Sequence, residues 1–486
     1  MRPKIRFLDD DLIEKIISEA VDLICKLGVE INNDNVLSLL GDHGARIDGE
    51  KKRVYYNQEI IDKSLKTALG SFKLYNSLGK EAVDLSGYNV NFTPGSAAIN
   101  ILDGKTGEIR RPVTSDYIAY SKLASRMSNM ASQSTAMVPS DVHVLISDSY
   151  RLFLSLIFCE KPVITGTFTI EAFEIMKDLQ LAIRGSKKEL AEKPLAVFSC
   201  CPTAPIKWSD VTSQNLLDCA KYSIPVEYIS MPLSGFMSPV TLVGTLVQHT
   251  AETLSGLVIS QLANPGTPVL YGGSPAVFDI RYETTPMGAI GTMMTDCAYN
   301  EIGKYLGLPT QAYIGLSDSK MLDAQAGLES SMGATLAALA GINNISGPGM
   351  LDFESCFSLE KLVVDNEICG MTLRMLKGIE PKEDFPSLPI FKELMKEQHL
   401  LISDHTRRYL KEEIYFPSPV IDRANRSRWK EEGGYTLGER ARKEVEKHIG
   451  EYEPVGLNDD IIKELTKLIG IEARRVGMDK LPEISG

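Results

Sequence analysis

The feature that most constrains the fold is a series of short β-prone runs, each ending in small or turn-forming residues and each followed by a helical stretch. Eight such runs start at Asn89, Ala131, Lys161, Lys193, Ile224, Thr267, Pro309 and Asn343. Their starts lie 30 to 43 residues apart, the length of a strand, a crossover helix and two loops. Repeated strand and helix units predict a parallel sheet, and eight of them favour a closed (β/α)8 TIM barrel over an open doubly wound sheet.

The barrel is predicted to span residues 89–355, with an added region on either side. Residues 1–88 combine an opening helical pattern with the hairpin-like "ARIDGEKKRVYY", which predicts an N-terminal α+β extension. Residues 356–486 are charged and helical, which predicts C-terminal helices that pack on the outside of the barrel or on another subunit. A chain of 486 residues is long enough for one barrel with such additions.

Composition argues against several classes of partner. The formal net charge is -12 and the pI is near 5.2, so a general electrostatic attraction to nucleic acid is not expected. The N-terminus "MRPKIRFLDDDLIEKI" lacks the apolar core of a signal peptide, and polar residues interrupt the longest apolar segments. We therefore expect a cytoplasmic protein with no membrane segment.

Metal and nucleophile motifs are missing. The chain has six histidines and no Cys-x-x-Cys, His-x-x-x-His or His-Glu-x-x-His spacing, so no tightly bound metal is predicted. Nothing resembles the Gly-x-Ser-x-Gly elbow of a serine hydrolase.

The predicted strand ends carry small residues and nearby aromatic ones. In a barrel the site forms at the carboxyl ends of the strands, and glycines there leave room for a ligand; they are Gly95, Gly166, Gly272, Gly273, Gly315, Gly347 and Gly349. Aromatic faces beside carboxylates suit a quaternary ammonium ligand, and the candidates are Phe92, Tyr271, Phe278, Tyr313 and Phe353. Core packing is the alternative for each aromatic residue, and turn formation is the alternative for each glycine.

One short stretch, "GLSDSKMLDAQAGLES", holds Asp318, Asp323 and Glu329 where a strand gives way to a helix. Three carboxylates there fit either the edge of a site or the cap of a helix. Both interpretations stay open.

Several longer motifs resemble the trimethylamine methyltransferase family. In chain order they are "FTPGSAAINILD", "ASQSTAMVPSDV", "KPVITGTF", "YGGSPAVFDIRY", "SDSKMLDAQAGLES" and "ISGPGMLDFESCFSLEKLVVDNEICGM", and the likeness covers about residues 5–450. The resemblance implies a (β/α)8 barrel that moves a methyl group from a methylamine to the cobalt of a corrinoid-binding protein. Family members that use trimethylamine carry pyrrolysine, whereas this chain has only standard residues. That difference implies a quaternary amine substrate, such as glycine betaine, proline betaine or carnitine.

The resemblance also implies partners and roles. The enzyme is expected to be a corrinoid-dependent methyltransferase, with the corrinoid (cobalamin) on a separate partner protein that docks on the glycine-lined opening, and to form a homo-oligomer. Asp318 is the predicted catalytic residue facing the substrate cation, and Glu329 is predicted to bind substrate. Two alternatives remain: a non-catalytic betaine-binding protein, and a barrel enzyme acting on a small cation without a corrinoid partner.

Overall fold

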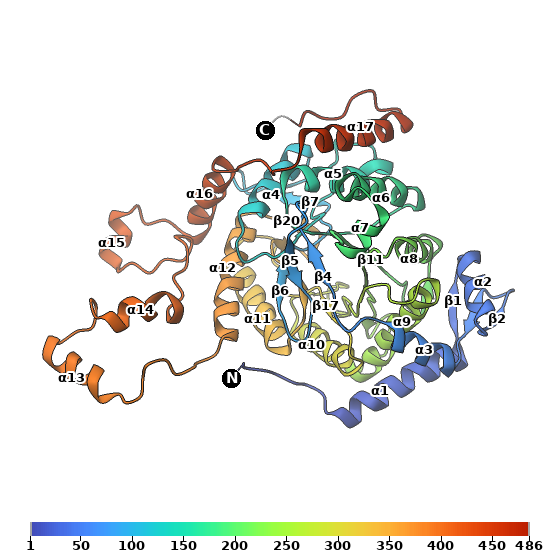
Figure 1. The fold of residues 1–486 in the computed structure, drawn as a ribbon, viewed down its shortest axis with the longest axis horizontal. Coiled ribbons are helices and arrows are strands. Elements are labelled where there is room, and N and C mark those ends of the chain that lie inside the picture. The colour runs from blue at the N-terminus through green and yellow to red at the C-terminus, as the bar shows by residue number, and fades with distance from the viewer. Residues whose placement is uncertain (1, 485–486) are drawn as a thin grey trace.

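Eight parallel strands, surrounded by helices, form the centre of the computed structural model, which describes residues 2–484 (Figure 1). Each predicted β-prone run contains one of them, and the α/β class is confirmed. The strands are β6 (Asn91–Thr93), β9 (Gln133–Ser134), β10 (Val163–Thr165), β11 (Ala196–Cys200), β13 (Val226–Tyr228), β15 (Val269–Leu270), β17 (Gln311–Ala312) and β18 (Asn344–Ser346).

The strands lie in two hydrogen-bonded sheets, with orders β15-β13-β11-β10-β9 and β17-β18-β6. All of these neighbours are parallel. Backbone contacts connect the edges of the two sheets: Tyr271 forms a parallel bridge with Thr310, and the Ala131 N–H donates to the Phe92 carbonyl at 2.9 Å. The order of the eight strands in space therefore follows their order in the sequence.

One face of the strands is closed at the amino ends by a hairpin. Ile164, Val197 and Leu270 pack together with the hairpin of β4 (Lys73–Tyr75) and β5 (Glu81–Asp84). The hairpin is fastened ahead of the strands, because the Tyr75 N–H donates to the Pro194 carbonyl at 2.9 Å. We call the face that carries Ile164, Val197 and Leu270 the inner face. Because the hairpin covers this face at the amino ends of the strands, a ligand would reach it from the carboxyl ends of the strands.

Helices cover the opposite face of the strands. They are α4 (Thr114–Arg126), α5 (Ser147–Phe158), α6 (Ile170–Arg184), α7 (Lys187–Glu192), α8 (Asp210–Tyr222), α9 (Leu242–Ala263), α10 (Ile290–Tyr305), α11 (Ala324–Ala340) and α12 (Leu359–Leu376). Helix α9 is buried along most of its length, because its apolar residues are not confined to one stripe and it packs against α1, α3, α8 and α10. Short strands lie in the loops: β7 (Asn100–Leu102), β8 (Ile109–Arg110), β14 (Leu233–Ser234), β16 (Ala276–Val277), β19 (Met350–Leu351) and β20 (Cys356–Phe357).

The N-terminal segment forms a small sheet with order β12-β1-β3-β2. Its own elements are α1 (Asp10–Asp22), β1 (Val29–Ile31), α2 (Asp34–Asp42), β2 (Arg46–Asp48), β3 (Arg53–Tyr55) and α3 (Gln58–Thr67). The fourth strand, β12 (Lys207–Trp208), comes from the loop after β11 and pairs in parallel with β1. The N-terminal segment is thus joined to the central strands by a shared sheet.

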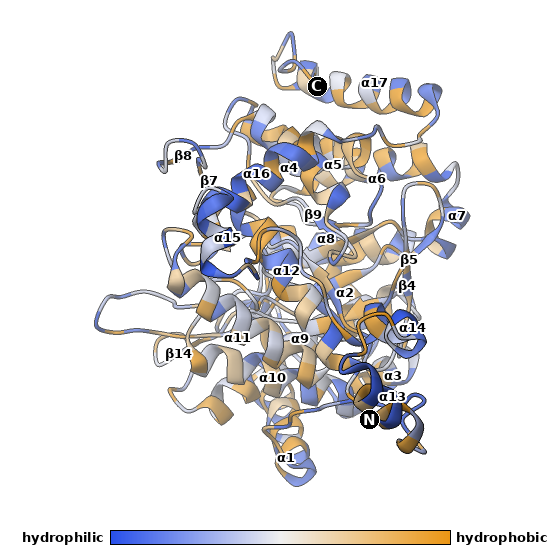
Figure 2. Ribbon diagram, turned by 90° about the vertical axis from the view of Figure 1, so that its left-hand side faces the viewer, coloured by the Kyte–Doolittle hydropathy of each residue, from blue (hydrophilic) through white to orange (hydrophobic). Residues whose placement is uncertain are grey.

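The C-terminal segment contains α13 (Leu388–Glu397), α14 (Asp404–Glu413), α15 (Arg426–Glu431), α16 (Leu437–Gly450) and α17 (Asp459–Arg475). Helix α16 packs on α4 and α12, and α17 packs on α5 and α6. Hydrophobic and hydrophilic residues alternate along α17 and α13 (Figure 2). Helices α13 and α14 project away from the rest of the molecule (Figure 1). No helix among residues 2–484 is long and apolar enough to cross a membrane.

Candidate functional site

A buried glutamate lies on the inner face at the carboxyl ends of the strands. Glu227 pairs in register with Ser199 and Leu270, and paired residues of parallel strands share a face. The Ser199 hydroxyl donates to Glu227 Oε1 at 2.7 Å. The side chain is 0% exposed, and Oε2 has no hydrogen-bond partner among the described residues. Burial raises the pKa of Glu227 to about 7, although Ser199 and the nearby Asn344 amide act to lower it.

A second glutamate is presented by an unusual turn after β19. Asp352, Phe353 and Glu354 have φ values of +50°, +54° and +67°, a left-handed conformation that costs free energy in residues other than glycine. The Asp352 N–H donates to the Ser319 carbonyl at 2.9 Å, which holds the turn in place. Glu354 Oε1 is buried without a partner among residues 2–484. Burial, with a further contribution from the charge of Asp318, raises the pKa of Glu354 to about 8.

A third acid comes from helix α10. Asp296 is 0% exposed, and neither carboxylate oxygen has a hydrogen-bond partner in the described part of the chain. Tyr299, three residues later on the same helix face, donates its hydroxyl to the carbonyls of Gly273 and Gln311 at 2.9 and 2.8 Å. This contact directs that face of α10 toward the ends of β15 and β17. Burial, with a contribution from Glu354, holds the pKa of Asp296 well above its usual range.

Tyr313 and Cys201 lie beside these acids. Tyr313 is 5% exposed, and its hydroxyl lies 3.4 Å from the Ser96 hydroxyl. Burial raises the pKa values of Tyr313 and Cys201, and the charges of Glu227 and Glu354 raise both further. We call Glu227, Asp296 and Glu354 the carboxylate cluster. Among residues 2–484, no lysine or arginine forms an ion pair with any of the three.

The carboxylate cluster has the chemistry to accept a positively charged ligand. A buried carboxylate without a counterion is unstable unless it is protonated or compensated by a positive ligand. A quaternary ammonium ion has no N–H to donate, so it is held by nearby negative charge and aromatic faces rather than by directed hydrogen bonds. The described residues contain no group of three or more His, Cys, Asp or Glu side chains placed to hold a metal ion.

Asp318 and Glu329 lie together in a surface pocket beside the cluster. Asp318 accepts hydrogen bonds from the N–H groups of Met287 and Gly288, both at 2.9 Å, so it fastens the loop ahead of α10. Burial raises its pKa to about 6. Glu329 accepts from the Ser317 hydroxyl at 2.6 Å. Catalytic and substrate-binding roles for this pair stay predictions.

The third carboxylate of that stretch, Asp323, is a helix cap. It precedes α11 and accepts from the Ala326 N–H at 3.0 Å. The helix-cap interpretation is therefore confirmed for Asp323.

The five predicted aromatic residues do not form one cage. Tyr271 follows Leu270 and lies on the opposite face of β15, where its hydroxyl donates to Thr250 of α9 at 2.9 Å. Phe92 is buried in the hydrophobic core. Phe278 stacks on Phe236 with 4.8 Å between ring centroids, and the Phe353 ring lies 3.9 Å from Lys320 Nζ. Of the two tyrosines, Tyr313 lies close enough to Glu227 and Glu354 for their charges to raise the pKa of its hydroxyl, whereas Tyr271 does not.

The seven predicted glycines pack closely against neighbouring side chains or backbone. A Cβ at Gly272 would come within 2.5 Å of Gln311 Oε1, and one at Gly347 within 2.4 Å of the Ile314 carbonyl. Similar close contacts, or a positive φ, occur at Gly95, Gly273, Gly315 and Gly349, and a Cβ at Gly166 would lie 3.2 Å from the Ser199 carbonyl oxygen. These contacts give the glycines a packing reason. Their role in docking a corrinoid stays a prediction.

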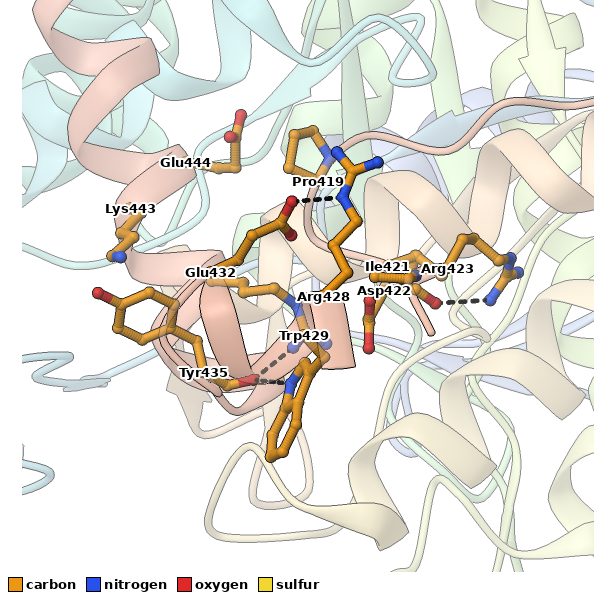
Figure 3. Close-up of a pocket in the computed structure, with 12 residues that line it drawn as sticks. Pro419, Ile421, Asp422, Arg423, Arg428, Trp429, Glu432, Tyr435, Lys443 and Glu444 are labelled. Carbon is orange, nitrogen blue, oxygen red and sulfur yellow. Dashed lines mark hydrogen bonds and ion pairs between the residues drawn. The ribbon is translucent and has the colours of Figure 1, made fainter. Parts of the chain in front are cut away.

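A further pocket lies in the C-terminal segment and is separate from the cluster (Figure 3). Its lining runs from Pro419 to Glu444 and includes Trp429 and Tyr435. It includes no residue of the carboxylate cluster.

The site so defined is a buried group of acids at the carboxyl ends of parallel strands. Comparison with known proteins assigns the chain to a class. The chain belongs to the trimethylamine methyltransferase (MTTB) family, whose model matches residues 1–477. It is 30% identical to a glycine betaine methyltransferase of Desulfitobacterium hafniense strain Y51, over 98% of each chain.

Two other relatives are trimethylamine methyltransferases. The protein from Desulfitobacterium hafniense strain DCB-2 is 28% identical over 95% of this chain and 93% of its own. The protein from Methanosarcina thermophila is 29% identical over 95% of this chain and 96% of its own.

Proposed function

We propose that this protein transfers a methyl group from a quaternary amine to the cobalt(I) of a corrinoid carried by a separate partner protein. Membership of the trimethylamine methyltransferase family supports methyl transfer. The similarity to a glycine betaine methyltransferase, and the absence of pyrrolysine from the sequence, favour a quaternary amine over trimethylamine.

The observation that carries the proposal is the carboxylate cluster. Glu227, Asp296 and Glu354 are acids with buried, unpartnered oxygens, and no cation of the chain pairs with them among residues 2–484. A quaternary ammonium ion supplies the missing positive charge and demands no hydrogen bond in return. Tyr313 adds an aromatic ring at the same place.

The chemistry balances without an acid, a base or a bound metal ion of the enzyme. The corrinoid acts as a substrate, the methyl acceptor. An electron pair of cobalt(I) forms a bond to the methyl carbon while the carbon–nitrogen bond breaks, and the bonding pair returns to nitrogen as a neutral tertiary amine. Cobalt becomes methylcobalt(III). The enzyme's work is to bind the cation, align one methyl group with the acceptor and exclude water.

We further propose that the eight parallel strands close into a (β/α)8 barrel and that the partner docks at its carboxyl end. The loops after those strand ends expose large apolar side chains at Phe168, Phe236, Ile280, Tyr282 and Met321, which are 60% to 76% exposed. Apolar side chains grouped around an opening favour a protein partner over free solvent. In this scheme Asp318 and Glu329 act as positioning residues, because their hydrogen bonds hold the loops that border the opening.

The test is methyl transfer with a panel of donors. The enzyme is mixed with chemically reduced cobalamin, or with a corrinoid protein, and with glycine betaine, proline betaine, carnitine, choline or trimethylamine. We expect a change from the cobalt(I) to the methylcobalt(III) spectrum with at least one quaternary amine and none with trimethylamine. Transfer from trimethylamine alone would contradict a quaternary amine as the methyl donor. Demethylation of a donor at the same rate without any corrinoid would contradict a corrinoid as the methyl acceptor.

A further inference from the structure

The surface pocket beside the carboxylate cluster brings together two chain segments that are fastened to each other. One contains Ser319 and Lys320, and the other is the left-handed turn at residues 352–354. The Asp352 N–H donates to the Ser319 carbonyl at 2.9 Å, and Lys320 Nζ lies 3.4 Å from Asp352 Oδ1. Lys320 is thus fixed beside the turn that presents Glu354 to the cluster.

The ammonium group of Lys320 is held in one place and still has a donor to offer. Its Nζ donates to the Asp318 carbonyl at 2.8 Å and lies 3.9 Å from the centre of the Phe353 ring. An ammonium group has three N–H donors, and the contacts with Asp318 and Asp352 use two of them. The Lys320 side chain is 53% exposed, so the third donor is accessible to a ligand in the pocket.

The other cation that lines this pocket is neutralised by a close partner. The Arg281 guanidinium donates to both carboxylate oxygens of Asp279, at 2.9 and 2.6 Å. A bidentate pair of this kind satisfies both charges and leaves little attraction for a further anion. Lys320 pairs less closely, with a single oxygen of Asp352 at 3.4 Å. Of the two, Lys320 is therefore the cation whose charge can act on a ligand.

The remaining charged groups that line the pocket are acids. They are Asp279, Asp318, Asp323 and Glu329. Like charges repel, so a ligand carboxylate that enters this pocket is disfavoured unless a cation lies next to it. Within the described part of the chain, the favourable charged partner for such a group is Lys320.

The two signs of charge lie in the order that a zwitterion requires. Glu227 and Asp296 of the carboxylate cluster are fully buried, whereas Lys320 is half exposed in the surface pocket. A betaine carries a quaternary nitrogen at one end and a carboxylate at the other. With the nitrogen at the buried acids, the carboxylate is directed toward the surface, where Lys320 lies. The pocket has a volume of about 550 Å³, within the range of small-molecule sites.

We propose that Lys320 binds the carboxylate of the substrate and so selects a zwitterionic betaine over a quaternary amine that has no acid group. This inference rests on the proposed function, because the quaternary nitrogen has to occupy the carboxylate cluster. The ligand class is a trimethylammonium group joined to a carboxylate by a short chain. Lys320 contacts the end of the substrate that does not react, so it acts on KM and leaves kcat unchanged.

Isothermal titration calorimetry with the full chain tests the inference. The zwitterionic probes are glycine betaine and 4-(trimethylammonio)butanoate, and the probes without a carboxylate are tetramethylammonium and choline. Lys320→Met is expected to raise the Kd of the tighter-binding zwitterion about tenfold, the effect of one partly exposed charge-assisted hydrogen bond. The same variant should bind tetramethylammonium and choline at least as tightly as the wild type does. Lys320→Arg keeps the charge and should restore most of the affinity for the zwitterion.

Arg281→Gln is the matched control, because it removes the other exposed cation of the same pocket. Its Kd for the zwitterion should stay within about twofold of the wild-type value, and a tenfold loss would assign the carboxylate to Arg281 instead. A Lys320→Met protein that binds both zwitterions as the wild type does would overturn the inference. So would an equal loss of affinity for zwitterions and tetramethylammonium, which indicates a structural role.

The same titrations separate this inference from the proposed function. A wild type that binds tetramethylammonium but neither zwitterion would overturn the role of Lys320 and leave a quaternary amine as the methyl donor. A wild type that binds none of the four probes would overturn the cation site itself, and the role of Lys320 with it. None of these measurements depends on methyl transfer or on a corrinoid.

Discussion

Replacing Glu227 by glutamine removes one charge from the carboxylate cluster and keeps the shape of the side chain. The pKa of Glu227 is raised from 4.5 to about 7 by burial. An acid whose pKa is raised on folding contributes full stability below its unfolded pKa and loses it as the pH rises through the folded pKa. A shift of about 2.5 units therefore costs the ligand-free protein about 3 kcal/mol above pH 7.

Glu227→Gln should avoid that cost, because glutamine stays neutral and still accepts from the Ser199 hydroxyl. We expect the variant to be more stable than the wild type at pH 8, by up to about 3 kcal/mol, and equally stable near pH 4.5. Removing the charge should also weaken tetramethylammonium binding by about 2–4 kcal/mol, since unit charges about 4 Å apart attract by about that much at an effective dielectric constant near 20. This corresponds to a Kd about 30- to 700-fold higher.

Thermal unfolding at the two pH values and isothermal titration calorimetry at pH 8 measure both effects. The matched control is Glu252→Gln. Glu252 is equally buried, but it accepts from the Ile206 N–H, the Gln248 amide and the Ser230 hydroxyl at 2.6 to 3.0 Å. Its variant should lose stability and keep its affinity. A Glu227→Gln protein that is destabilised at pH 8 and binds tetramethylammonium as the wild type does would refute the reasoning.

Three further outcomes are expected. Tetramethylammonium binding should strengthen between pH 6 and pH 8.5 and release protons, because the raised pKa values of Glu227 and Glu354, about 7 and about 8, let the cation favour their ionised forms; calorimetry in buffers of different ionisation enthalpy checks this, and pH-independent binding would contradict it. Asp318→Asn should lower the free energy of unfolding by about 1–3 kcal/mol, because one backbone N–H loses its acceptor. The same variant should slow methyl transfer more than it weakens cation binding, and an unchanged kcat would show that Asp318 is not a positioning residue. Trp429→Ala, in the C-terminal pocket, should change neither the affinity for tetramethylammonium nor the transfer rate, and a loss of either would connect that pocket to the site.

The central strands were predictable because their signal is local and repeated. Each run is short and β-prone, ends in residues that favour turns, and is followed by a helical pattern at a regular distance. The pairing of β12 with β1 was not predictable in the same way, because it joins residues about 180 positions apart through a two-residue strand. The domain boundaries at residues 88 and 355 stay predictions.

The prediction of an aromatic cage depended on knowing which face of its strand each aromatic residue occupies. A shift of one residue reverses the face, and "TPVLYGGS" does not reveal whether Leu270 or Tyr271 points inward. Only the register with Val197 and Glu227 shows that Leu270 lies on the inner face.

The sequence did contain signals for two of the three acids. Glu227 is a lone carboxylate in the apolar run "IPVEYISM", and Asp296 is one in the buried helical stretch "GTMMTDCAYN". Charged residues are rarely fully buried without a partner, so such positions are candidates for a site. Glu354 carried no such signal, because its placement depends on three successive left-handed residues without a glycine.

Transfer of a labelled methyl group tests the central claim most directly. Glycine betaine with trideuterated methyl groups, or another donor that proves active, is incubated with the enzyme and reduced cobalamin, and the products are identified by mass spectrometry. We expect trideuteromethylcobalamin and the corresponding tertiary amine in equal amounts, with formation much reduced in Glu227→Gln. No labelled methylcobalamin from any quaternary amine, or an undiminished yield in Glu227→Gln, would contradict the assignment of the carboxylate cluster as the site of methyl transfer.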